Sequence, residues 1–238
     1  MRAVGRFPDG PGGSGTSARM RAVVFDMDGV IVDSEAQWKA LEGEFFRAAV
    51  PGWREEHHAA IVGMGVEDVY RHLASVHGLT LGLEEFLARS DRVAREVYEE
   101  KVALAPGFLD LLADLERRGV PAAVASSSPA RWIALVMDRF DLRPRFRAVV
   151  SADDAGGRTK PLPDIYLEAV RRLGLPAAEC LAIEDSAIGL LAAKRAGLRA
   201  AALRTSHNAD QDLALADFEL TGFSSLDYPR LAARFAAR

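Results

Sequence analysis

The chain has 238 residues, of which 49% are hydrophobic and 27% charged, and its formal net charge is -4. This balance excludes the basic surface typical of proteins that bind nucleic acid or an anionic membrane. The single cysteine cannot form an intrachain disulfide, and no hydrophobic run reaches the roughly 20 residues that span a bilayer. We therefore expect a cytoplasmic protein, monomeric by default, with no nucleic-acid or membrane partner.

Residues 1–19 are rich in glycine, proline and serine and predict a flexible tail. The first predicted strand covers residues 23–25 and stops at two carboxylates, Asp26 and Asp28, which Gly29 follows. Open α/β sheets carry their chemistry at the edge where such strands end. A simple polar turn would use the same residue types, so this stretch alone leaves both interpretations open.

Hydrophobic residues then recur at helical spacing over a long stretch without a convincing strand. This pattern predicts an all-helical domain, residues 37–102, that is inserted into an α/β chain. The core domain then comprises residues 20–36 and 103–238.

Strands and helices alternate from Leu104 onward. Because parallel neighbours need crossover connections, this alternation predicts an α/β fold with a parallel sheet. The predicted helices cover residues 108–118, 130–140, 164–173 and 187–194, and the predicted strands cover residues 120–125, 148–151, 180–183 and 200–203.

Polar residues directly follow three of the predicted strands. Asp26 and Asp28 come after the first, Ser126 after the second, and Glu184 and Asp185 after a later one. Since crossover handedness places the carboxyl ends of parallel strands on one edge, we expect these groups to converge. Clustered carboxylate oxygens are the hard ligands that Mg²⁺ prefers.

Four motifs resemble, in order, the signatures of the haloacid dehalogenase superfamily: the run Asp26-Met27-Asp28-Gly29, then Ser126, then Lys160, and finally the pair Glu184-Asp185. The resemblance covers residues 20–203 and is greatest to the branch of β-phosphoglucomutase and the sugar-phosphate phosphatases. It implies a Rossmann-like parallel sheet core with an inserted helical cap domain. It also implies action on a small phosphorylated metabolite.

The resemblance also implies a role for each residue. Asp26 corresponds to the nucleophile, which forms an aspartyl-phosphate, and Asp28 to the general acid/base, which also lends its backbone carbonyl to the metal. Mg²⁺ is the implied cofactor, because it offsets the repulsion between a carboxylate and a phosphate. The implied phosphate-binding residues are Ser126, Ser127 and Lys160, and the implied metal ligands are Asp26, Asp28, Glu184 and Asp185.

Each assignment has a structural alternative. Lys160 would by default be a solvated surface lysine, and the serines at 126–128 would be helix N-caps before Pro129. Glu184 and Asp185 would complement the dipole of the helix that follows them. The catalytic interpretation is favoured because all of these alternatives would have to hold at once.

The insert lies between the first and second motifs, where a cap could close over the phosphate site and contact the leaving group. We expect the hinges near residues 35–37 and 102–106, and the cap loop at residues 63–68 to face the site. Four further polar residues of the cap are expected to be solvated surface groups, and we do not assign them to the site: His57, His58, Arg71 and Lys101.

Departures from the mutase pattern favour hydrolysis. Trp38 stands where the mutase has a histidine, Val66 aligns with an arginine that binds a second phosphate, and Pro129-Ala130 replace a Lys-Asn pair. The expected activity is therefore that of a Mg²⁺-dependent phosphatase acting on a sugar-, polyol- or nucleoside-like phosphate. The alternatives are a phosphomutase of the β-phosphoglucomutase type and a non-catalytic binding protein on the same scaffold.

Overall fold

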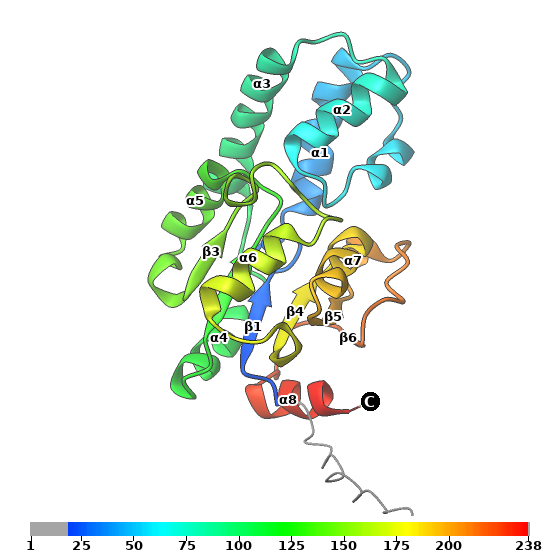
Figure 1. Cartoon of the computed structure of the whole chain (residues 1–238). Helices are drawn as coiled ribbons and strands as arrows, with labels where there is room; N and C mark the ends of the chain where they lie inside the picture. Colours follow the sequence, from blue (N-terminus) through cyan, green and yellow to red (C-terminus); the bar gives the residue numbers. More distant parts are fainter. Residues whose placement is uncertain (1–18, 238) are drawn as a thin grey trace, which may run out of the picture.

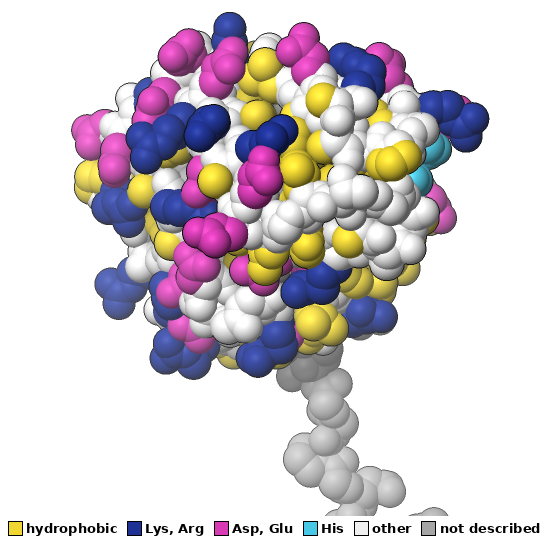
Figure 2. All heavy atoms as spheres, turned by 90° about the horizontal axis from the view of Figure 1, so that it is seen from above, with side chains coloured by type: hydrophobic (Ala, Val, Ile, Leu, Met, Phe, Trp, Pro, Cys, Tyr) yellow, Lys and Arg dark blue, Asp and Glu magenta, His cyan; other side chains and the backbone are white. Residues whose placement is uncertain are grey.

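The computed structural model describes residues 19–237. The predicted tail, residues 1–19, lies outside this range except for Arg19. None of the helices in the described range is long and apolar enough to cross a membrane. Seen from the end that carries the insert, acidic and basic side chains are intermixed over much of the surface (Figure 2).

The main elements are arranged along the chain as shown in Figure 1. The strands are β1 (Ala22–Phe25), β2 (Ala122–Ala125), β3 (Ala148–Val150), β4 (Cys180–Glu184), β5 (Arg199–Leu203) and β6 (Phe218–Leu220). The α-helices are α1 (Glu35–Ala49), α2 (Val66–His77), α3 (Leu83–Arg95), α4 (Phe108–Arg117), α5 (Ala130–Arg139), α6 (Asp164–Leu173), α7 (Ala187–Arg195) and α8 (Tyr228–Ala236). A 3₁₀ stretch covers Glu55–Ala60, and a π-helical turn covers Glu96–Lys101.

The six strands form one parallel sheet in the order β3-β2-β1-β4-β5-β6. β1 is central and pairs with both β2 and β4. Phe25 lies opposite Val124 on one side and Ile183 on the other, so the three strands end at nearly the same level. The residues that follow them therefore meet at one edge of the sheet, and the predicted parallel α/β fold is confirmed.

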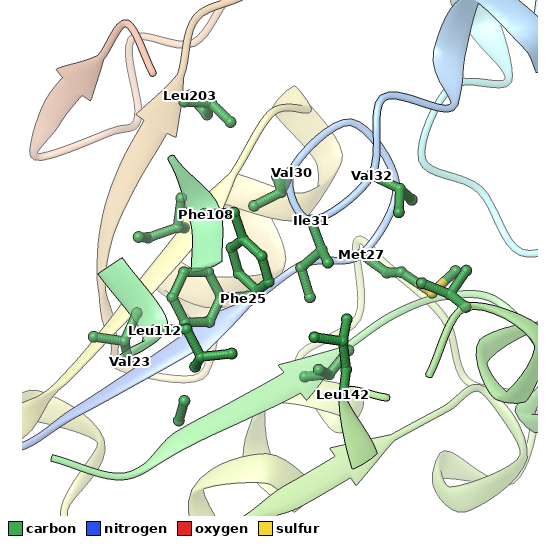
Figure 3. Close-up of a cluster of buried hydrophobic side chains, with 14 of the residues drawn as sticks. Val23, Phe25, Met27, Val30, Ile31, Val32, Phe108, Leu112, Leu142 and Leu203 are labelled. Carbon is green, nitrogen blue, oxygen red and sulfur yellow. The ribbon is translucent and has the colours of Figure 1, made fainter. Parts of the chain in front are cut away.

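Side chains of β1 alternate between two hydrophobic layers. Val23 and Phe25 pack with α4, α5 and α8, whereas Ala22 and Val24 pack with α6 and α7. Phe25 belongs to the first layer, and its ring packs edge-on against that of Phe108, with the ring centroids 5.4 Å apart (Figure 3). Because both faces of β1 are buried, the acidic residues that follow it stand on a rigid support.

The insert contains α1, α2 and α3 and has a hydrophobic core of its own, which includes Phe46, Leu73 and Phe86. The expected all-helical cap is thus present, and we propose that it extends over residues 37–102, starting within the first turn of α1. Its two connections to the core run side by side. The Asp33 amide donates to the Ala103 carbonyl at 3.1 Å, and the Ala105 amide donates to the Ile31 carbonyl at 2.9 Å.

Three details differ from the expectation. The second strand begins at Ala122 rather than at residue 120, because the Val120 amide closes the turn after α4 by donating to the Leu115 carbonyl. Strand β6 was not predicted, because it has three residues and one of them is Glu219. Helix α8 was not predicted either, although its N-cap, Asp227, is of a typical residue type.

Candidate functional site

The ends of the central strands and one loop bring the predicted residues together. Asp26 follows β1, Ser126 follows β2, and Glu184 ends β4. Lys160 reaches the same place from the loop before α6, and only 3% of this residue is exposed to solvent. The alternative of a solvated surface lysine is therefore wrong for this side chain.

Lys160 joins two of the carboxylates. Its Nζ lies 2.6 Å from Oδ1 of Asp26 and 2.6 Å from Oε1 of Glu184. Burial alone would lower the pKa of Lys160, but the charges of Asp26 and Glu184 outweigh burial and raise it. The ammonium group therefore stays charged and holds the two carboxylates at fixed positions.

Three carboxylates cluster around this single ammonium group. Asp26, Glu184 and Asp185 are buried, and each offers an oxygen within 4.8 Å of the others. Burial raises the pKa of Asp26 to about 8, against the lowering effect of Lys160 and with further raising effects of Glu184 and Asp28. Without a further cation, the negative charge of the cluster is therefore disfavoured. An all-oxygen donor set with this charge fits a Mg²⁺ ion.

Two glycines allow the backbone to approach the acidic side chains. A Cβ on Gly29, where φ is +71°, would lie 2.0 Å from Oδ2 of Asp185. A Cβ on Gly189 would lie 2.1 Å from the carboxyl carbon of Glu184. These positions exclude any larger residue unless the acidic side chains move.

Asp28 occupies a second part of the site, where hydroxyl groups surround it. Oδ1 accepts hydrogen bonds from the Ser34 hydroxyl and the Tyr98 hydroxyl, both at 2.7 Å, and Oδ2 accepts one from the Ser128 hydroxyl at 3.2 Å. Burial and the nearby Asp28 charge raise the pKa of Tyr98 well above its usual value, so its hydroxyl remains a donor. These contacts hold the Asp28 carboxyl in one orientation.

The serines after β2 point into the site rather than capping the next helix. The residue that caps α5 is Pro129, which makes no side-chain capping bond. The Ser126 hydroxyl accepts from the Ser128 amide at 3.1 Å, and the Ser127 hydroxyl accepts from the Lys160 amide at 3.4 Å. Within the described residues, the amides of Met27, Asp28 and Ser127 have no acceptor, so they are available to an anion.

The acidic pair does not supply the N-cap of the helix that follows it. Ser186 caps α7, and its hydroxyl accepts a hydrogen bond from the Gly189 amide at 3.1 Å. Glu184 instead accepts hydrogen bonds from Tyr166 at 2.6 Å and from Ser186 at 3.1 Å. The Asp185 carbonyl accepts one from Asn208 at 2.7 Å.

A cavity of about 80 Å³ lies between this edge of the sheet and the insert. The core contributes Asp26, Asp28, Ser126, Ser127, Lys160 and Asp185, and the insert contributes Trp38, Glu42, His58, Gly63, Met64 and Val66. The cap loop at 63–68 therefore faces the site through its first residues. The walls contributed by the insert are mainly hydrophobic, as is common in pockets that bind small molecules.

The four cap residues left unassigned from the sequence have different environments. Arg71 and Lys101 form surface ion pairs, with Asp68 at 2.5 Å and Glu96 at 3.6 Å respectively. His57 stacks against His77 with ring centroids 4.5 Å apart. His58 lines the cavity, so treating it as a surface group was wrong.

Sequence reasoning missed the partners of the acidic residues. Ser34 lies shortly after the first motif, so the sequence could have indicated it as a partner of Asp28. Tyr98, Tyr166 and Asn208 were not, because their contacts join segments that lie far apart in the chain.

Comparison with known proteins agrees with this geometry. The sequence model of the haloacid dehalogenase-like hydrolase family matches residues 20–197 of this chain. The chain belongs to this family. The enzyme class expected from the sequence, a phosphatase among these hydrolases, is confirmed by the names of its relatives.

Two relatives and one solved structure illustrate the match. The chain is 29% identical over 216 residues to hexitol phosphatase B of Escherichia coli (strain K12), covering 89% of this chain and 96% of that protein. It is 32% identical over 216 residues to protein CbbY of Cereibacter sphaeroides, covering 87% of this chain and 94% of that protein. A mutant CbbY from Rhodobacter sphaeroides, in complex with xylulose-(1,5)bisphosphate, superimposes with a TM-score of 0.76 at 29% identity, covering 88% of this chain and 98% of that chain.

Proposed function

We propose that the protein is a Mg²⁺-dependent phosphatase that hydrolyses a small phosphate monoester through an aspartyl-phosphate on Asp26. The observation that carries the proposal is the buried ion pair in which Lys160 contacts Asp26 and Glu184, at 2.6 Å each, beside Asp185. An excess of carboxylates around one lysine suits a site that binds a divalent cation together with a phosphate.

The metal would be held by Asp26, Glu184 and Asp185, together with the backbone carbonyl of Asp28. When bound, Mg²⁺ offsets the negative charge that accumulates between the carboxylates and the phosphate. The Asp26 carboxylate attacks the phosphorus atom and displaces the leaving alcohol, which splits the reaction into two easier steps. Water then attacks the phosphorus of the aspartyl-phosphate and regenerates Asp26.

Asp28 acts as the general acid/base in this proposal. It gives a proton to the leaving oxygen in the first step and takes one from the attacking water in the second. Ser126, Ser127 and Lys160 bind the phosphate oxygens, supported by the free amides of Met27 and Asp28. The insert covers the site and limits the access of water.

Two cavity residues favour hydrolysis over phosphoryl transfer between two positions of a sugar. A mutase has to bind a second phosphate, whereas Val66 and Trp38 present hydrophobic surface to the cavity. The names of similar proteins support action on a small phosphorylated metabolite: one is a hexitol phosphatase, and a CbbY mutant was solved in complex with xylulose-(1,5)bisphosphate. A cytoplasmic location and a monomeric state stay predictions from the sequence.

A phosphate-release assay with p-nitrophenyl phosphate and a panel of sugar and polyol phosphates tests the proposal. We expect hydrolysis that needs Mg²⁺ and is lost with EDTA. Conversion of a sugar 1-phosphate to the 6-phosphate without phosphate release would support the mutase instead. No turnover of any ester with Mg²⁺ would contradict the proposal and support the non-catalytic binding protein.

A further inference from the structure

The cavity beneath the insert contains polar side chains that the proposed chemistry does not use. Glu35, Glu42 and His58 line it next to Asp28 and Asp185. Within residues 19–237, none of these three side chains has a hydrogen-bond or ion-pair partner in the protein. Polar groups in partly buried positions normally have partners, so groups left free in a cavity are available to a ligand.

The register of α1 explains how two of these groups reach the cavity. Glu35, Trp38 and Glu42 are three and four positions apart and therefore lie on one face of the helix. His58 reaches the cavity from the 3₁₀ stretch Glu55–Ala60. Ile61 belongs to the hydrophobic part of the lining.

The charges around this space do not suit a second phosphate. Among the described residues that line the cavity, Lys160 is the sole lysine or arginine, and it already contacts Asp26 and Glu184. Burial, together with the nearby Lys39, lowers the pKa of His58, so its imidazole is neutral at neutral pH. Lys39 is not among the residues that line the cavity, so a phosphate on the leaving group would lose its hydration there without a lining cation to replace it.

Hydroxyl groups on the leaving group do suit this cavity. A carboxyl oxygen accepts a hydrogen bond from an alcohol, and a neutral imidazole can donate one or accept one. Hydrophobic lining residues would pack against the carbon chain of such an alcohol.

We propose that Glu42 and His58 form the leaving-group subsite and select monophosphates of neutral, hydroxylated alcohols over bisphosphates of the same alcohols. This inference rests on the proposed phosphatase function and specifies its substrate class. Glu42 is the residue on which the selection depends most, because it faces the cavity on the same side of α1 as Trp38.

The test compares matched substrates on the wild-type enzyme with Mg²⁺. Glycerol 3-phosphate, ribitol 5-phosphate and glucitol 6-phosphate are each compared with the terminal bisphosphate of the same polyol. Ethanolamine phosphate supplies a cationic leaving group, and p-nitrophenyl phosphate one without aliphatic hydroxyls. We expect kcat/KM for the best polyol monophosphate to exceed that for its bisphosphate at least 10-fold.

Variants on one helix assign the effect to Glu42. In Glu42→Leu, we expect the ratio of kcat/KM for the best polyol phosphate to that for p-nitrophenyl phosphate to fall at least 10-fold. Glu44→Leu is the matched control, because Glu44 lies on α1 but is exposed to solvent, and the ratio should not change. An unchanged ratio in Glu42→Leu would overturn the role of Glu42.

The outcomes separate this inference from the function on which it rests. If p-nitrophenyl phosphate is hydrolysed but a bisphosphate or ethanolamine phosphate is the preferred substrate, the subsite inference is wrong and the phosphatase function stands. If no ester is hydrolysed with Mg²⁺, both are wrong.

Discussion

The hydroxyl of Tyr98 donates a hydrogen bond to Oδ1 of Asp28 at 2.7 Å, although the two residues are 70 positions apart in the chain. Tyr98 belongs to the last helical turn of the insert and also accepts a hydrogen bond from the Trp38 indole at 3.3 Å. The proposed acid/base is thereby connected to both ends of the cap. The position of the cap and the orientation of Asp28 are therefore expected to depend on each other.

Removing the Tyr98 hydroxyl tests this connection. Tyr98→Phe keeps the ring in the core but deletes a hydrogen bond to a carboxylate, an interaction that contributes about 1.5–3 kcal/mol. We expect kcat to fall roughly 10-fold or more, with a smaller change in KM. Steady-state kinetics with p-nitrophenyl phosphate measures both constants. Unchanged kcat in a folded variant would show that Asp28 does not need this contact.

Replacing Gly29 should disturb the proposed metal site. In Gly29→Ala, the new Cβ would lie 2.0 Å from Oδ2 of Asp185, so this side chain has to move. We expect Mg²⁺ affinity to fall by about 10–100-fold, the range seen when the groups around metal ligands are altered. Isothermal titration calorimetry with Mg²⁺ measures the change.

Gly78→Ala is the control for backbone strain. Gly78 has φ of +68°, close to the +71° of Gly29, but its Cβ would meet nothing within 4 Å. Both variants are destabilised by a similar free energy, about 1–2 kcal/mol, because alanine disfavours the left-handed conformation. Equal Mg²⁺ affinity in the two variants would argue against a metal site beside Gly29.

Removing the Lys160 charge should destabilise the protein. Lys160→Met leaves Asp26 and Glu184 buried without their cation, a change that typically costs about 3–5 kcal/mol. Mg²⁺ should recover part of this loss, since it would bind the same carboxylates. Thermal unfolding with Mg²⁺ and with EDTA measures both effects. A Tm equal to that of the wild type in EDTA would be inconsistent with the buried ion pair.

Glu42 should make stability depend on pH. Burial beside Glu35 and Asp28 raises its pKa to about 8 from a usual value of 4.5. Between these values the folded chain holds a proton that the unfolded chain has lost, so stability falls as pH rises, by at most about 1.4 kcal/mol per pH unit. Glu42→Gln removes this contribution, and its stability relative to wild type should increase from pH 5 to pH 8.

Urea unfolding at several pH values measures this difference. Glu44→Gln serves as the control, because Glu44 is exposed on the same helix. If the free energies of unfolding of wild type and Glu42→Gln change in parallel with pH, the environment of the Glu42 carboxyl does not disfavour its charge.

The sequence was sufficient to predict the core strands that carry the motifs. Their hydrophobic runs are short and end at acidic or hydroxyl residues, and the sheet topology follows from the alternation with helices. Asp26, Ser126 and Glu184 could be placed because each lies at or just after the end of a predicted strand. Lys160 required the family resemblance, since its loop has no periodic pattern.

The remaining features depend on contacts that a single sequence does not encode locally. Tyr98 lies in a helical turn whose pattern says nothing about Asp28, and His58 lies in a polar stretch that is typical of a surface. Glu42 has the spacing of the buried face of α1, but a glutamate at such a position is usually assigned to solvent. Placing these side chains required the packing of the insert on the core.

The central claim is that Asp26 is the nucleophile, and trapping its phosphorylated form is the most direct test. A ³²P-labelled monoester is mixed with excess enzyme and Mg²⁺, quenched with acid within a single turnover, and the labelled peptide is identified by mass spectrometry. The proposal predicts label on Asp26, no label in EDTA, and neither label nor turnover in Asp26→Asn. Full turnover by a folded Asp26→Asn enzyme, with no labelled peptide in the wild type, would contradict it.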